Sequence, residues 1–174
     1  MDDWTSLALA ARDGDAEALT ALVRLTQPHV WRLCAHLADR ETADDLTQET
    51  YVRALRSLAR YRGDSPIRVW LFTIARRVVA DEISRRQRRR RRPEPTPAPP
   101  APDHAGAVAT EALLAHLDPQ RREAFVLTQL LGYPYADAAE ICGCPVGTVR
   151  SRVARAREQL VDLLGEDESA DRTA

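Results

Sequence analysis

Lysine is absent from this 174-residue sequence: all 25 of its basic residues are arginines, set against 26 acidic residues. Phenylalanine is scarce as well, with two in the whole chain. No run of apolar residues approaches the ~18–20 that a membrane-spanning helix requires, and the acidic N-terminus does not resemble a signal peptide. We therefore expect a cytoplasmic protein that does not insert into a membrane.

Residues that could support catalysis or bind a metal are few. The three cysteines are Cys34, Cys142 and Cys144, and a Cys-x-Cys spacing is too short for a usual zinc-binding pair. The four histidines are scattered, and neither a nucleophile with its base nor a metal-binding spacing accompanies them. We expect no enzyme, cofactor, metal or small-molecule substrate.

The formal net charge is −1, but the charges are strongly segregated along the chain. Residues 1–50 carry four arginines and ten acidic residues, whereas residues 51–92 carry fourteen arginines and three acidic residues. Residues 93–174 are acidic again, with seven arginines and thirteen acidic residues. Such asymmetry indicates that particular faces bind a polyanion while acidic surface lies elsewhere.

Proline marks a boundary between two parts of the chain. Six of the ten residues 93–102 are prolines, which excludes a helix or a central strand there. We predict a helical domain at 1–92, an extended, flexible linker at 93–107, a second helical domain at 108–165 and an acidic tail at 166–174. The linker would let the two domains act at separate places.

Both domains are predicted to be all-α, because glycine is scarce and no alternating strand pattern appears. Asp15 and Thr42 are the expected N-caps of the second and third helices, and Pro28 should kink or break the second. The expected helices cover residues 3–12, 15–38, 42–60, 66–90, 110–117, 119–131, 135–141 and 146–164.

The end of the second domain predicts a helix-turn-helix. Gly143 suits the left-handed residue of a tight turn, and Pro145 suits the start of the helix that follows. On that helix an apolar row faces inward, formed by Val149, Val153, Ala156 and Leu160. The remaining faces carry four arginines within eight positions and small residues that would allow close approach to a DNA groove. The alternative is an ordinary helical hairpin with a solvated basic face.

Residues 43–60 predict an amphipathic helix with a mixed outer face. The inward row is expected to contain Ala43, Thr47, Tyr51, Ala54, Leu55 and Leu58. The opposite side carries Asp45, Glu49, Val52 and Arg56, with Leu46 and Gln48 at its margins. Apolar residues on that side favour a protein-binding surface, although helix caps and scattered surface apolar residues are the alternative.

A dense basic stretch follows in the first domain, with an arginine pair at 76–77 and a second run at 85–92. Arginines that neutralise phosphates give salt-dependent affinity for nucleic acid. Trp70 and Tyr61 lie beside arginines in the sequence, an arrangement that suits stacking on single-stranded bases. The competing interpretations are a core role for Trp70 and a simple basic tail for the run.

Three segments together resemble the extracytoplasmic-function (ECF) sigma factors of the sigma-70 family. They are DDLTQETYVRAL, RGDSPIRVWLFTIARRVVADEI and, after the linker, LDPQRREAFVLTQLLGYPYADAAEICGCPVGTVRSRVARAREQL. The resemblance implies a subunit that binds core RNA polymerase and directs it to a two-part promoter. The DNA-reading parts would be a sigma region 2-like first domain, which melts and reads the −10 element, and a region 4-like second domain for the −35 element.

The resemblance also implies roles for single residues. Polymerase binding is expected at Asp45, Leu46, Gln48 and Glu49, to which the mixed face adds Val52. Recognition of the −10 element is expected at Arg62, Ser65, Trp70, Arg76, Arg77, Asp81, Arg85 and Arg86. Recognition of the −35 element is expected at Thr148, Arg150, Ser151, Arg152, Arg155 and Arg157. The family often has asparagine where this chain has Arg77, so its preference for −10 bases is not carried over.

The expected partners are therefore core RNA polymerase, promoter DNA as duplex and melted strand, and in some relatives an anti-sigma factor. We also hypothesise that the free chain masks its DNA surfaces by packing the basic first domain against acidic parts of the second. The main alternative is a self-contained regulator that binds a symmetric operator as a dimer without polymerase.

Overall fold

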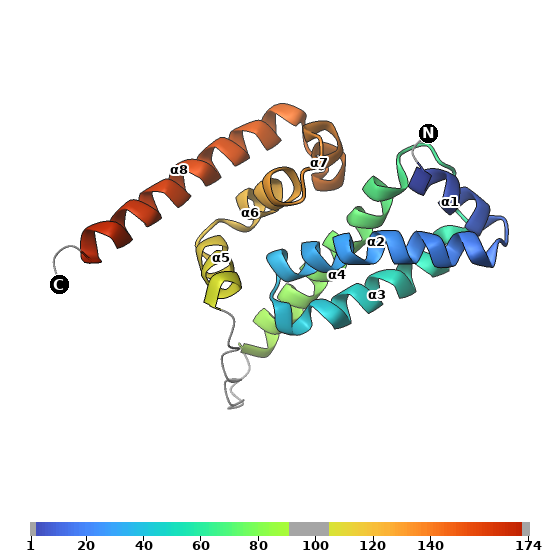
Figure 1. Cartoon of the computed structure of the whole chain (residues 1–174), viewed down its shortest axis with the longest axis horizontal. Helices are drawn as coiled ribbons and strands as arrows, with labels where there is room; N and C mark the ends of the chain where they lie inside the picture. The colour runs from blue at the N-terminus through green and yellow to red at the C-terminus, as the bar shows by residue number, and fades with distance from the viewer. Residues whose placement is uncertain (1–2, 91–104, 172–174) are drawn as a thin grey trace.

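The computed structural model describes residues 3–90 and 105–171, and it is all-helical in those ranges, as predicted. Two groups of helices lie side by side, α1–α4 and α5–α8, and the long α8 projects away from the rest (Figure 1). The elements are α1 (Asp3–Arg12), α2 (Ala16–Leu37), α3 (Arg40–Leu58), α4 (Ile67–Arg90), α5 (Ala105–Ala115), α6 (Pro119–Phe125), the π-helical segment η1 (Val126–Leu130), α7 (Tyr135–Cys142) and α8 (Val146–Asp171). None of the helices in this part of the chain is long and apolar enough to cross a membrane.

Helix α2 begins as predicted but does not break. The Asp15 side chain accepts hydrogen bonds from the amides of Glu17 and Ala18, which fixes the start of the helix. We expected a kink or a break at Pro28. The predicted break is wrong, because the helix continues through Pro28 to Leu37. Pro28 is exposed, so the carbonyl group that loses its amide partner lies on the side of the helix facing water.

Helix α3 begins earlier than predicted and has a different cap. Asp39, in an extended conformation, accepts hydrogen bonds from the Thr42 amide and hydroxyl, so Thr42 lies inside the helix instead of capping it. The second oxygen of Asp39 accepts a hydrogen bond of 2.5 Å from Arg86 on α4. Asp39 therefore takes the capping position predicted for Thr42, and it also ties the start of α3 to α4.

The core of α1–α4 is centred on α2 and α4, where Val30, Leu33 and Phe72 are fully buried. Two predictions about α3 are wrong in detail. Leu46, expected at the margin of the outer face, is only 5% exposed, whereas Leu55, expected inside, is 48% exposed. The inward row includes Thr47 and Thr50, whose hydroxyl groups bond to the carbonyls of Ala43 and Leu46 one turn earlier and so need no water. This row turns Leu46 inward and Leu55 outward.

Several boundaries in the second group of helices differ from prediction. Helix α5 already begins at Ala105, within the predicted linker, and α8 continues through the predicted acidic tail to Asp171. The single helix predicted at 119–131 is α6 followed by η1. Residues 93–104 of the predicted linker, together with Arg91 and Arg92, lie outside the described residues.

The turn between α7 and α8 forms as predicted. Gly143 has the left-handed conformation, with φ of 64°, and the Cys144 amide bonds to the Ala139 carbonyl across it. The angle between the helices is thus set by a short turn that a side chain at position 143 would strain. The result is a helix-turn-helix that presents the first half of α8 on the outside of the molecule.

Candidate nucleic-acid and protein interfaces

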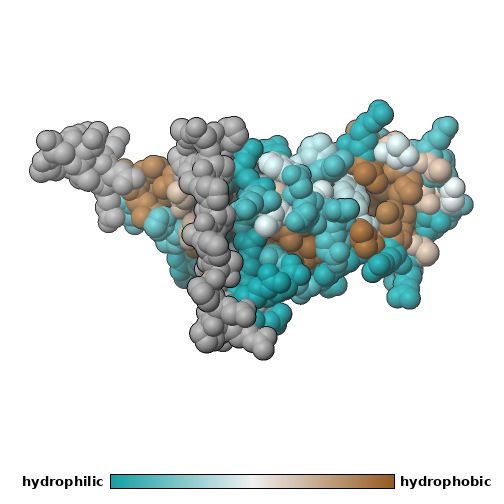
Figure 2. All heavy atoms as spheres, turned by 90° about the horizontal axis from the view of Figure 1, so that it is seen from below, coloured by the Kyte–Doolittle hydropathy of each residue, from teal (hydrophilic) through white to brown (hydrophobic). Residues whose placement is uncertain are grey.

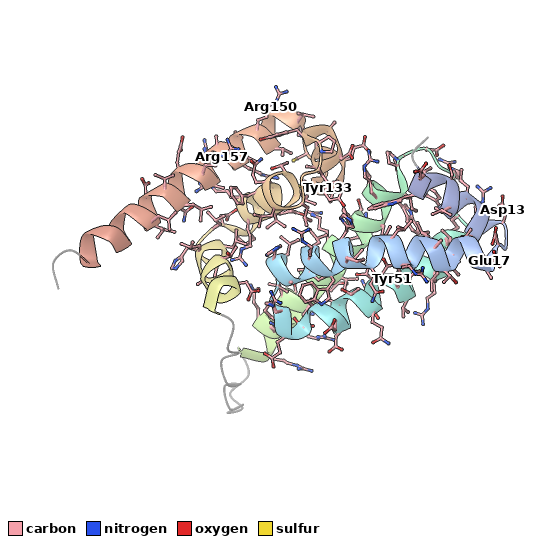
Figure 3. The ribbon with its side chains drawn as sticks, viewed as in Figure 1. Asp13, Glu17, Tyr51, Tyr133, Arg150 and Arg157 are labelled. Carbon is pink, nitrogen blue, oxygen red and sulfur yellow. The ribbon has the colours of Figure 1, made fainter. Side chains whose placement is uncertain are left out.

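The outer face of α8 is an exposed arginine surface on a rigid base. Val149, Val153 and Ala156 are at most 2% exposed and anchor the helix against the core, as the sequence predicted. On the opposite side, Arg150 and Arg155 are exposed, and Arg150 points away from the rest of the molecule (Figure 3). Ser151 and Ala154, also exposed, leave little bulk between the arginines. This surface can approach duplex DNA closely with guanidinium groups extended.

The other predicted residues of this surface are held by their own chain. Arg152 is half-buried, donating to Gln120 Oε1 at 2.5 Å and to Cys144 Sγ at 3.4 Å. Arg157 donates to the Gln129 side chain. Thr148 is half-buried, and its carbonyl accepts a hydrogen bond from the Ser151 hydroxyl at 2.9 Å. The structure thus separates free arginines from arginines whose direction is fixed.

A second surface runs along α3 and is defined here as the α3 stripe: Asp45, Gln48, Val52 and Leu55. Asp45, Gln48 and Leu55 are exposed and Val52 is half-buried, so the stripe changes from acidic to apolar along the helix. Glu49 lies beside it, half-buried. Leu46, expected on this surface, packs in the core and positions the helix from within. Leu55 was placed inward because Thr50, which is fully buried, was not recognised as able to line the core.

Arg53 was not singled out in the sequence, yet it connects two of the predicted sites. Its Nε donates to Glu49 at 2.7 Å and its Nη1 donates to Asp81 of α4 at 2.7 Å. The bonds to Asp81 and then Glu49 raise the pKa of Arg53 above its usual value. The i, i+4 spacing of Glu49 and Arg53 is a sequence signal for half of this network, but the link to α4 depends on the tertiary fold.

The basic residues of α4 fall into two groups. Arg77 is exposed and forms no ion pair among the described residues, and Arg85 is exposed and pairs with Glu82. Arg86 bonds to Asp39 and Glu82 and thereby ties α4 to the start of α3. Arg77 and Arg85 therefore remain turned to solvent, whereas Arg86 braces the fold.

The loop before α4 carries the other residues predicted to contact the −10 element. Arg62 is highly exposed and pairs with Asp64 at 2.8 Å. The Tyr61 hydroxyl donates to the Ser65 carbonyl at 2.6 Å, and the Tyr61 ring lies 5.3 Å from the Trp70 ring. Trp70 is half-buried and packs against two apolar clusters, one within the first group of helices and one shared by both groups, in keeping with the core interpretation.

Basic residues of α4 meet acidic residues of the second group of helices. Arg68 donates to Asp137 at 2.5 Å, and Arg76, one of the residues predicted to read DNA, pairs with Glu123. Burial raises the pKa of Glu123, and the charge of Arg76 opposes that rise. The masking hypothesis anticipated this kind of contact. It covers part of the α4 surface, while the outer face of α8 stays exposed.

Aromatic side chains reinforce the same contact. The Tyr133 ring lies 4.9 Å from the Phe72 ring, edge to face, and the Tyr133 hydroxyl is 3.2 Å from His29 Nδ1. Burial, more than the nearby Arg32, lowers the pKa of His29. Burial also raises the pKa of Tyr133. Apolar residues from both groups belong to one continuous core cluster, so the two groups form one packed body.

A helix-turn-helix with free arginines, joined to a second arginine-bearing helical body, defines a class of DNA-binding proteins with two separate recognition elements. Residues 22–89 match the family model "Sigma-70 region 2" and residues 107–160 match "Sigma-70, region 4". The chain belongs to the sigma-70 family, in its ECF group of RNA polymerase sigma factors. The resemblance predicted from the sequence is confirmed.

Similar proteins extend over nearly the whole chain. It is 48% identical to the ECF RNA polymerase sigma factor SigC of Mycobacterium tuberculosis over 164 residues, which are 90% of this chain and 89% of the relative. Identity to EcfG of Rhodopseudomonas palustris is 39% over 140 residues, 77% and 76% of the two chains. The solved structure of Bartonella quintana RpoE with the anti-sigma factor NepR has a TM-score of 0.74 at 30% identity, covering 86% of this chain and 98% of that one. The structure of CnrH with the cytosolic domain of CnrY has a TM-score of 0.77 at 27% identity, covering 95% and 99%.

Proposed function

We propose that this sigma factor binds core RNA polymerase in the cytoplasm through the α3 stripe and directs initiation at promoters that it reads at two places. It is an initiation factor, and the proposal assigns it no catalytic step. The observation that carries the proposal is the exposed face of α8: Arg150, Ser151 and Arg155 are exposed on a helix-turn-helix whose other side is buried in a core.

The α3 stripe supports the assignment to polymerase. Its acidic end, Asp45 with Gln48 and the neighbouring Glu49, offers hydrogen-bond acceptors to a basic partner surface. Its other end, Val52 and Leu55, offers apolar area, and Leu55 is one of four large apolar side chains exposed in the described part of the chain. Figure 2 shows apolar patches on an otherwise hydrophilic face at the end of the molecule where α1–α3 lie. A mixed surface of this kind is typical of interfaces between proteins.

For the −10 element, the proposed contacts divide into available and restrained residues. Arg62, Arg77, Asp81 and Arg85 are exposed; all but Arg77 form ion pairs at the surface, which water can replace. Ser65 and Trp70 lie beside them, half-buried, at the loop and the first turn of α4. Arg76 becomes available only when its pair with Glu123 breaks, and Arg86 keeps a bracing role through Asp39. We therefore assign melting and reading to the loop and to the free side of α4.

For the −35 element, Arg150, Ser151 and Arg155 are assigned to base edges, and Thr148 and Arg152 to phosphates. Arg152 suits a phosphate because the bonds to Gln120 and Cys144 fix its direction, and fixed cations set the register of a protein on DNA without reading its bases. Arg157, tied to Gln129, is assigned to the backbone as well.

An anti-sigma factor is a proposed partner, because the relative RpoE was solved in complex with one. The contacts Arg68–Asp137 and Arg76–Glu123 support a further layer of control within the chain, since they hold α4 against the second group of helices. A partner that binds this closed form would stabilise it by mass action.

In vitro transcription with purified core polymerase and genomic DNA tests the proposed function. New start sites that appear only with the protein present, preceded by two shared sequence elements roughly two duplex turns apart, are the expected result. The self-contained regulator makes the opposite prediction: a gel shift on a symmetric operator without polymerase, and no new start sites.

A further inference from the structure

Helix α1 lies outside the matched family regions, which begin at residue 22, yet it touches the loop that carries the proposed −10 contacts. Three of its residues, Thr5, Leu9 and Arg12, follow one another at intervals of four and three and so share one face of the helix. Each of them contacts a different part of residues 61–67. The helix therefore lies along the loop from its beginning to its end.

The contact at Thr5 completes the start of α4. The first amides of a helix have no partner within it, and a side chain just before the helix usually supplies an acceptor. Here that position is Pro66, whose side chain has no acceptor. The Ile67 amide instead donates to Thr5 Oγ1 at 3.0 Å, and both residues are buried, 3% and 1% exposed. Thr5 is a helix cap supplied by a different helix.

Two further contacts hold the beginning and the middle of the loop. Arg12 Nη1 donates to the Tyr61 carbonyl at 3.2 Å. Gly63 has a φ of +79°, and a Cβ there would stand 3.4 Å from Leu9 Cδ2, so the backbone passes close against α1. Contacts with α1 therefore support both ends and the middle of residues 61–67.

We propose that Thr5 is a positioning residue for −10 recognition: by capping Ile67 it holds the loop with Arg62 and Ser65 in the shape that accepts promoter bases. The inference rests on the proposed function and adds to it a role for α1. A loop that is ordered in advance loses less conformational entropy when it binds, so it binds and discriminates better. Thr5 itself touches no DNA in this scheme and acts through the loop.

The test compares Thr5→Val, which keeps the side-chain shape and removes the acceptor, with Thr5→Ser, which keeps the acceptor. Initiation is measured with core polymerase on a promoter mapped with the native chain and on single-base-pair variants of its −10 element. For Thr5→Val we expect the preference for the native −10 element to fall by up to about five- to tenfold, the ceiling set by the stability that a lost cap removes. Thr5→Ser is expected to keep the native −10 preference. In both variants, binding to polymerase and binding to −35 duplex should not change.

Thr20→Val is the matched control, because the Thr20 hydroxyl bonds to the Ala16 carbonyl of its own helix on the surface. A second variant, Arg12→Met, removes the bond to the Tyr61 carbonyl from a less buried position and should shift the −10 preference in the same direction. Asp13→Asn is the control for Arg12→Met, because it removes the carboxylate that pairs with Arg12 and leaves Arg12 in place. If Thr5→Val does not fold, the −10 preference of Arg12→Met alone tests the inference.

An undiminished −10 preference in folded Thr5→Val and Arg12→Met overturns the inference. So does a loss of all activities in proportion to lost stability, with the −10 preference unchanged, because that result assigns Thr5 to the fold alone. If the native chain starts transcription nowhere new with core polymerase, the proposed function fails, and the role of Thr5 falls with it.

Discussion

Individual arginines in this chain differ in the contacts that their guanidinium groups make. Arg150 is exposed, whereas hydrogen bonds to Gln120 and Cys144 fix the direction of the Arg152 side chain. Arg86 bonds to Asp39, the residue that caps α3. All three occur in arginine-rich stretches that look alike in the sequence. The arginine-rich stretches predict that the protein binds a polyanion. The hydrogen bonds that each guanidinium group makes within the protein then determine which arginines are available to that polyanion.

Arg150→Ala is expected to remove about 1–3 kcal/mol of discrimination at the −35 element, because a guanidinium on a base edge contributes about that much to specificity. Fluorescence anisotropy on native and base-substituted −35 duplexes measures the difference. Arg152→Ala is the matched comparison and should weaken all duplexes alike. Equal losses for Arg150→Ala on every duplex would contradict its base-reading role.

Asp39 is a residue whose charge state should matter for stability. Burial raises its pKa, but hydrogen bonds from Arg86 and Thr42 outweigh this effect and leave the pKa lowered. A carboxylate with a lowered pKa stabilises the fold above its unfolded value of 3.8, and this contribution is lost as the pH falls through the folded pKa.

Asp39→Ala should therefore lower the free energy of unfolding by about 1 kcal/mol at neutral pH, mostly through the lost cap, because a partly exposed ion pair adds little. The deficit relative to the native chain should shrink as the pH is lowered below 3.8. Urea titrations at several pH values measure it. Asp39→Asn, which can still cap the helix, is the control, and a deficit independent of pH would contradict the role of the charge.

At the scale of elements, α3 shows how far a sequence pattern reaches. Periodicity predicts the helix and most of its inward row. It misplaces Leu46 and Leu55 because Thr50 was left out of the inward row, although its hydroxyl bonds to the Leu46 carbonyl of its own helix and the residue lines the core. The outward face is therefore the α3 stripe, with an acidic and an apolar end.

Asp45→Arg should abolish association with core polymerase while leaving the helix content and melting temperature unchanged, because Asp45 is exposed and lies on the stripe. Co-elution with core enzyme on a sizing column checks this. Glu17→Arg makes the same change in charge at an exposed site on α2, at the far end of the molecule from α8 (Figure 3), and should still co-elute. Co-elution of Asp45→Arg would refute the assignment.

At the scale of the whole molecule, the two groups of helices share a core and several ion pairs. The contact joins Arg68 and Arg76 of α4 to Asp137 and Glu123, with Tyr133 packed between Phe72 and His29. It covers part of the surface proposed for the −10 element and leaves that for the −35 element open. Free protein would therefore bind −35 duplex more readily than melted −10 strand.

Asp137→Arg should open the molecule, because it places a cation against Arg68. We expect a larger radius of gyration in solution scattering and tighter binding of −10 single strand without polymerase, with binding to −35 duplex unchanged. The double variant Arg68→Asp with Asp137→Arg exchanges the two charges, so it should restore the ion pair and the smaller radius of gyration. Native protein that already scatters as separate, non-contacting domains would disprove the masking hypothesis.

The sequence by itself determined the helical fold, the helix-turn-helix and the family, and it indicated the stretches that we propose to face DNA and polymerase. These follow from local periodicity, the turn chemistry of Gly143 and the density of arginines, all of which lie in short segments. Only the tertiary structure decided that Arg86 bonds to the residue that caps α3, which face of α3 holds Leu55, which arginines remain free and what α1 supports. Each of these depends on partners far apart in the chain, such as Asp39 and Arg86 or Thr5 and Ile67, and no local pattern specifies which distant side chain will arrive.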